Sequence, residues 1–150
     1  MSKLKDRLRA DLTISIKARD EVRTSTLRMV LTAVTNAEVA GKATRQLSDD
    51  DVLGVLASEA KKRREAAEAF DAGGRPERAV HERAEAVVIA EYLPEQLSAE
   101  EVSTLVAEAI SATGAESARE MGKVMGALQP KVRGRAAGGA VAAEVRRQLS

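Results

Sequence analysis

The sequence predicts an all-α protein, and three observations carry this prediction. Of its 150 residues 28 are alanine, whereas it has one tyrosine, one phenylalanine and no tryptophan. Chains that are rich in alanine and poor in aromatic residues build their cores from close helix contacts rather than from β-sheet layers. Apolar residues also recur at helical spacing, and no alternating β-pattern survives over five residues. Finally, capping residues, glycines and prolines divide these periodic stretches into segments of helical length.

Two amphipathic helices are predicted in the first 40 residues. Leucine or isoleucine occupies every fourth position from residue 4 to residue 16, within a charged background. A second helical pattern begins near Asp20, and its apolar stripe runs from Leu27 to Ala37. Gly41 ends this helix, and the following residues up to Leu47 form a polar connector.

A third and a fourth helix follow the connector. Ser48 is a good N-cap, and the three aspartates after it suit the positive end of a helix dipole. This third helix is expected to run to Gly73. Pro76 then occupies the first turn of a fourth helix, where a proline is well tolerated, and the apolar pattern continues to Tyr92.

Pro94 stops the fourth helix, because the residue before a proline disfavours the α conformation. We place one domain boundary here, so that residues 1–94 form an N-terminal domain of about four helices and residues 95–150 a small three-helix tail domain. Capping-box patterns at Ser98–Glu101 and Ser117–Glu120 begin the first two tail helices. Gly114 and Pro130 are expected to end them, and a last helix carries Val141, Val145 and Leu149.

Composition excludes several classes of protein. Without cysteine there is no disulfide, thiol nucleophile, iron–sulfur cluster or zinc finger. The single histidine, His81, has no nominated nucleophile or orienting partner, so a surface or capping role is expected for it. No apolar run reaches the roughly 18 residues of a membrane span, and charges alternate where a secretion signal needs an apolar stretch. We therefore expect a cytoplasmic protein with no membrane segment, no metal, no cofactor and no catalytic residue of its own.

Two groups of basic residues are candidates for binding. The run Glu59–Glu65 holds four consecutive cations, but these wrap around a helix and nearby glutamates can neutralise them, so a solvated face is favoured over a binding site. From Ser117 to Ser150, seven Lys and Arg stand against two Glu, which gives a local charge of +5. Such a basic tail with glycines can follow a phosphate backbone, although plain solubilising charge is the alternative. The candidate RNA-binding residues are Lys123, Lys131, Arg133, Arg135 and Arg146.

Three small residues fall four apart in the second tail helix, namely Ala118, Gly122 and Gly126. Small residues in a line allow another helix to approach closely, so we expect a helix-packing face here, on which a bulky side chain would force the helices apart. The segment is not a phosphate loop, because such a loop has its Gly-Lys-Ser/Thr at the other end of the spacing.

Six short segments together resemble the YqeY-like family, which is related to the C-terminal helical and tail region of the GatB subunit of tRNA-dependent amidotransferases. These segments are Leu27–Met29, Glu59–Glu65, Ala72–Arg75, Tyr92–Leu97, Met121–Gly126 and Pro130–Arg135. The resemblance covers essentially the whole chain and implies a helical N-terminal domain followed by a three-helix tail. The family's basic loop usually continues Gly-Arg-Ala-Asp, whereas this chain has Ala137 in place of the acid, which removes a good cap for the last helix.

The resemblance also orders the hypotheses for function. In the amidotransferase subunit the corresponding tail is thought to engage tRNA, so we expect a non-catalytic helical module that binds tRNA or a tRNA-associated complex through its basic tail. One alternative is a component of glutamine-dependent amido transfer, a carbon–nitrogen ligase activity, acting with amidotransferase or aminoacyl-tRNA-related partners that supply the chemistry. A helical protein–protein adaptor is the other alternative.

Overall fold

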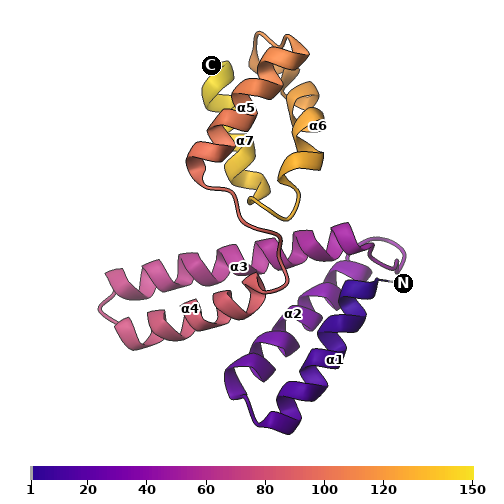
Figure 1. The fold of residues 1–150 in the computed structure, drawn as a ribbon, viewed down its shortest axis with the longest axis vertical. Helices are drawn as coiled ribbons and strands as arrows, with labels where there is room; N and C mark the ends of the chain where they lie inside the picture. Colours follow the sequence, from indigo (N-terminus) through magenta and orange to yellow (C-terminus); the bar gives the residue numbers. More distant parts are fainter. Residues whose placement is uncertain (1) are drawn as a thin grey trace. The chain divides into compact units, whose positions relative to one another are not determined.

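The computed structural model describes residues 2–150, and these residues form seven α-helices and one short 3-10 helix, with no strand (Figure 1). The all-α prediction is thereby confirmed. The chain divides into two compact units, one that ends at Leu93 and one that comprises Pro94–Ser150. Whether they fold independently, as the predicted domains 1–94 and 95–150 would, stays a prediction.

The first unit consists of two helical hairpins. Its helices are α1 (Lys3–Ala18), α2 (Glu21–Val39), α3 (Asp49–Ala72) and α4 (Pro76–Ala90). Helix α1 packs against α2, helix α3 packs against α4, and α2 also contacts both helices of the second hairpin. Consecutive helices run in opposite directions, so the short loops between them are sufficient to connect them (Figure 1).

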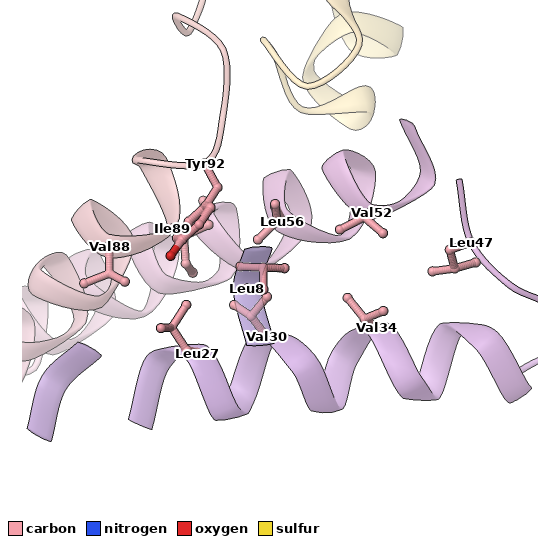
Figure 2. Packing of buried hydrophobic residues seen from close by; sticks show 11 residues of the cluster. Leu8, Leu27, Val30, Val34, Leu47, Val52, Leu56, Val88, Ile89 and Tyr92 are labelled. Carbon is pink, nitrogen blue, oxygen red and sulfur yellow. The ribbon is translucent and has the colours of Figure 1, made fainter. Parts of the chain in front are cut away.

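Leucine and valine side chains from all four helices form the core of this unit. Figure 2 shows Leu27, Val30 and Val34 of α2 facing Val52 and Leu56 of α3. The whole buried cluster is Leu8, Leu27, Val30, Val34, Leu47, Val52, Leu56, Ala60, Val88, Ile89 and Tyr92. Most residues of the apolar stripes predicted from helical spacing are buried or half-buried, but Ile16 of α1 and Val80 and Val87 of α4 are exposed.

Tyr92 lies just beyond the end of α4, because this helix stops at Ala90 and does not extend to Tyr92 as expected. The tyrosine ring is buried, its hydroxyl donates a hydrogen bond of 2.5 Å to Oδ2 of Asp11, and the guanidinium of Arg7 lies 4.6 Å from the ring centroid. Burial and the bond to Asp11 raise the pKa of Tyr92 to about 12. The phenol therefore stays protonated and ties the end of α4 to α1.

The second unit is built on three α-helices. These are α5 (Ala99–Thr113), α6 (Met121–Val132) and α7 (Gly138–Leu149), with the 3-10 helix η1 (Ala118–Glu120) directly before α6. Each α-helix packs against the other two. Valine dominates the buried cluster, which comprises Val102, Val106, Ala109, Ala115, Val124, Leu128, Val132, Val141, Val145 and Leu149.

Local capping signals begin two of the helices as predicted. At the start of α3, the Ser48 hydroxyl accepts from the Asp51 N–H and the Asp51 carboxylate accepts from the Ser48 N–H, both at 3.1 Å. Ser98 and Glu101 make the same reciprocal pair at the start of α5. Gly114 ends α5 with a φ of +70°, a conformation that glycine adopts without strain.

The structure corrects two predictions in the second unit. Ser117 makes no side-chain cap, because the Glu120 carboxylate accepts from the Glu116 N–H at 2.6 Å and the chain enters α6 through η1 instead. Pro130 does not stop α6, which continues to Val132. Val132 is buried in the valine-rich core, so its packing favours the last turn despite the proline.

Helix α7 begins without a cap. Ala137 occupies the N-cap position with φ −67° and ψ 131°, has no side-chain oxygen to offer, and is followed by Gly138 and Gly139 in a first turn that contains no acid. The first N–H groups of this helix thus lack the acceptor that Ser98 supplies to α5.

Replacing Ala137 by Asp or Ser should stabilise the protein by about 0.5–2 kcal/mol, because either side chain can accept from the first-turn N–H groups. Denaturant titrations monitored by circular dichroism measure this change. Ala143→Asp, on an exposed interior position of the same helix, is the control and should not stabilise. If neither Ala137 variant is more stable than the wild type, the missing N-cap of α7 does not lower the stability of the protein.

Candidate nucleic-acid interface

The five predicted RNA-binding residues do not form one cluster. Helices α6 and α7 run in opposite directions and are joined by the loop Arg133–Ala137 (Figure 1). Lys131, Arg133 and Arg135 lie together at this loop. Lys123 precedes Lys131 by eight residues, which is about 12 Å along a helix, and Arg146 is equally far from the start of α7. The structure therefore brings three of the five residues together and leaves two at the opposite end of the helices.

At the loop end, Lys131 and Arg133 are both exposed. The Lys131 ammonium makes no hydrogen bond or ion pair with any side chain or carbonyl of residues 2–150. A solvated ammonium with no carboxylate beside it retains its full charge for an external anion. Lys131 is therefore the strongest single phosphate-binding candidate at this end.

At the opposite end, the candidates differ in their partners. The Arg146 guanidinium is exposed and is also without a partner in the described chain. Lys123 Nζ lies 3.7 Å from Oε1 of Glu120, but both side chains are largely exposed, so this pair holds the lysine only weakly. The neighbouring Arg147 pairs with Glu144, whose pKa is lowered to about 2 by hydrogen bonds from Arg147 and Gln148.

Arg135 has a structural role that its charge did not indicate. Its side chain is half-buried, its Nε donates to the carbonyl of Glu95 at 3.1 Å, and its Nη1 lies 3.4 Å from the carbonyl of Lys131. The Arg135 carbonyl in turn accepts from the N–H of Leu97 at 2.8 Å. Arg135 thus anchors the loop to the residues that precede α5, while its charge remains at the candidate site.

A glutamine that was not among the sequence candidates completes this anchor. Gln96 Nε2 donates to the carbonyl of Gly134 at 2.7 Å and to the carbonyl of Pro94 at 2.8 Å. Gly134 is buried and has a φ of +72°, a conformation that disfavours residues with a Cβ. No local sequence signal could have revealed this contact, because Gln96 and Gly134 are 38 residues apart.

The predicted helix-packing face is exposed instead. Ala118 lies in η1 rather than in α6, and Ala118, Gly122 and Gly126 are all exposed. A Cβ added to Gly122 or Gly126 would meet no atom within 4 Å outside its own helix neighbourhood. This corrects the expected helix contact, because the three tail helices pack through the valine-rich side of α6.

Gly122→Ala and Gly126→Ala should each stabilise the protein by about 0.5–1 kcal/mol, since alanine is the better helix former and the added methyl group meets only solvent. Urea titration of the single variants and the double variant provides the measurement. Gly134→Ala is the contrasting control and should destabilise, because its φ is positive. Destabilisation by the two helix variants would restore the packing interpretation.

Three of the four cations in the basic run of α3 face carboxylates of the first unit, and the fourth, Arg64, is exposed. Lys61 and Lys62 lie 3.7 and 3.6 Å from carboxylate oxygens of Glu65 and Glu59. Arg63 turns toward α4 and faces Glu59, Glu82 and Glu85 at 3.6, 3.6 and 4.0 Å. These pairs support the interpretation of the run as a solvated and internally neutralised face.

Glu85 is the most perturbed carboxyl of this cluster. It is buried, and burial followed by the charge of Glu82 raises its pKa above the ordinary 4.5, against the opposing effects of His81 and Arg63. His81 Nε2 lies 2.9 Å from Glu85 Oε1, so the histidine serves as a surface partner of this carboxyl.

A raised pKa means that the folded state binds the Glu85 proton more tightly than the unfolded state does. The free energy of unfolding contributed by this group is therefore largest below the ordinary glutamate pKa and declines as the pH rises through the raised value. Glu85→Gln should remove this decline, so its stability relative to the wild type should increase from about pH 4 to about pH 7. Denaturant titrations across that range test this, with exposed Glu68→Gln as the control, and a constant difference would contradict it.

A groove of about 460 Å³ lies between α2 and α3 in the first unit. Its two cations both face carboxylates, since Arg45 Nη1 is 3.4 Å from Asp51 and Lys62 is 3.6 Å from Glu59. This groove therefore offers no excess of positive charge for a phosphate, in contrast to the loop end of the tail.

Two classes of site are not seen in the described part of the chain. Residues 2–150 contain no group of three or more His, Asp or Glu side chains that could hold a metal ion. None of the helices in the same range is long and apolar enough to cross a membrane.

The fold and the site define an all-α protein with a first unit of two hairpins and a small tail unit of three α-helices, whose residues 117–150 carry an excess of basic side chains. A family model described as "Yqey-like protein" matches residues 5–149, so the chain belongs to the YqeY-like family. The comparison with curated proteins gave no match.

Proposed function

We propose that this protein binds tRNA through the loop end of its tail unit, and that it supplies binding rather than chemistry. The observation that carries the proposal is the pair Lys131 and Arg133, both exposed at one loop in a segment with a charge of +5. The Lys131 ammonium has no partner among residues 2–150, whereas cations of the first unit such as Lys5 and Arg23 are held by Glu38 and Glu91 at 2.8 and 2.7 Å. The excess of positive charge in the second unit lies in residues 117–150, because over residues 94–150 seven Glu balance the seven Lys and Arg, and five of these Glu precede Ser117.

Composition supports recognition of the RNA backbone rather than of bases. The chain's two aromatic residues, Phe70 and Tyr92, both precede the tail, so the tail has no ring on which a base could stack. Lysine and arginine contacts to phosphate position an RNA without reading its sequence. The relation of the family to the tail of an amidotransferase subunit favours tRNA among folded RNAs, and the proposal carries with it a location in the cytoplasm, where tRNA is used.

The double variant Lys131→Gln/Arg133→Gln should bind tRNA more weakly than the wild type, because each neutralised phosphate releases condensed counterions. The slope of log affinity against log salt should become shallower by about 0.7–0.9 for each phosphate that the variant no longer neutralises. Arg135 is left unchanged, since its substitution would also disturb the loop. Titrations of labelled tRNA at several salt concentrations measure both quantities, and the decrease in affinity should be similar for different tRNAs.

Lys61→Gln/Lys62→Gln is the matched control, because it removes the same charge from a face that Glu59 and Glu65 neutralise. This control should change the affinity less. Arg146→Gln reports whether the other end of α7 also contacts the RNA. Equal salt slopes for the wild type and the loop variant would remove the loop from the interface. No wild-type binding at low salt would contradict the proposal and favour the protein–protein adaptor.

A further inference from the structure

We propose that Gln96 is a positioning residue of the RNA site, acting through a clasp between the segment Pro94–Leu97 and the loop Arg133–Ala137. The clasp consists of three hydrogen bonds. Gln96 Nε2 donates to Gly134 O at 2.7 Å, Arg135 Nε donates to Glu95 O at 3.1 Å, and Leu97 N donates to Arg135 O at 2.8 Å. The inference rests on the proposed function, since it concerns how the same loop is held for tRNA.

The clasp is reciprocal, which distinguishes it from a single surface hydrogen bond. A side chain from each segment donates to a main-chain carbonyl of the other, and a main-chain bond from Leu97 to Arg135 joins the same two segments. Two carbonyls of the loop, those of Gly134 and Arg135, thereby gain donors from the other segment. Carbonyls satisfied in this way fix the peptide planes of the loop and not only its position.

Main-chain hydrogen bonds to α6 also hold this loop. Its start follows the end of α6, with Arg135 N and Ala136 N donating to Val132 O at 2.9 and 3.1 Å. Its far end is Ala137, which gives α7 no side-chain cap. Gly134, between them, has a positive φ and the conformational freedom of glycine. The Gly134–Arg135 and Arg135–Ala136 peptides are therefore held from two sides, by α6 through their N–H groups and by the clasp through their carbonyls.

The clasp affects binding through the fraction of molecules whose loop is in the binding-competent conformation. Without the clasp, the loop samples conformations in which Arg133 is not directed toward the same phosphate backbone as Lys131 of α6, and the apparent affinity falls with the fraction of competent molecules. The contacts in the bound state are unchanged, so the number of counterions released is the same. An uncharged side chain can thus alter the affinity for RNA without altering its salt dependence.

Gln96→Met removes the donor while keeping the length of the side chain, and it should lower tRNA affinity about three- to tenfold with an unchanged salt slope. Arg135→Lys is the second variant, because it retains the charge but lacks the Nε donor to Glu95, and it should behave in the same way. Gln148→Met is the matched control. Gln148 Nε2 donates to the Ser103 carbonyl at 2.9 Å and joins α7 to α5 away from the loop, so its substitution should leave affinity unchanged below the melting transition.

Hydrogen exchange of the Leu97 N–H provides a readout that does not depend on affinity. This amide should exchange faster in Gln96→Met than in the wild type and in Gln148→Met, and saturating tRNA should slow its exchange in the wild type, because coupling between two sites is reciprocal.

The wild-type titration distinguishes a failure of the positioning role of Gln96 from a failure of the proposed function. If the wild type binds tRNA in a salt-dependent manner and Gln96→Met binds equally well, the positioning role is wrong and the proposed function stands. If Gln148→Met lowers the affinity by the same factor, the effect reflects a general loss of stability, and the positioning role of Gln96 is also wrong. If the wild type does not bind, both proposals fail.

Discussion

Small side chains in both cores are the constraint on which the rest of this structure depends. Alanine, valine and leucine make up nearly all of the buried clusters, and Tyr92 is their one aromatic member. Each such side chain buries less apolar area than an aromatic ring would, so each contributes less to stability. Directional hydrogen bonds therefore have to fix the helix ends. Ser2 and Asp49 at 2.5 Å and Tyr92 and Asp11 at 2.5 Å do this between helices of the first unit.

Small core side chains limit stability more in the tail unit than in the first unit. The tail unit has only 57 residues, 94–150, and a smaller unit leaves a larger share of its surface unburied. Its first helix has a complete capping box, whereas its last helix starts at an alanine followed by two glycines. The loop before that last helix is held instead by Gln96 and Arg135, through contacts to residues about 40 positions away. These contacts satisfy carbonyls of the loop, so they hold the chain before α7 without supplying the acceptor that the first N–H groups of α7 lack.

This difference between local and long-range contacts also decides what the sequence could predict. The caps at Ser48 and Ser98 depend on a residue three positions away, so the local sequence pattern was sufficient to predict them. The same pattern at Ser117 was not, because the Glu120 carboxylate bonds to a competing donor, the N–H of Glu116. Pro130 and the exposed Gly122 were misjudged for a related reason. Whether a helix continues past a proline, and what covers a glycine, depend on which faces pack in three dimensions.

For the candidate site, charge counting located the basic segment but could not assign roles within it. A count treats Lys131 and Arg135 as equivalent, whereas the first has an exposed ammonium without a partner and the second is bonded to the carbonyl of Glu95. For the cationic run of α3 the sequence already favoured a solvated face, and the direction of Arg63 toward three carboxylates of its own unit supports that prediction. Only burial and partners distinguish these cases.

One guanidinium therefore combines two effects that a charge-removing substitution cannot separate. Arg135 adds to the positive potential of the loop and also holds the loop's main chain, so its replacement by glutamine would weaken binding for either reason. Gln96 shares the second role but not the first, because it is uncharged and donates to the adjoining carbonyl. Comparing substitutions of the neutral Gln96 and of the charged Arg135 therefore separates the effect of loop geometry on affinity from the effect of charge. Under the proposed function, the fold as well as the number of cations would determine how much of the charge of residues 117–150 an RNA contacts.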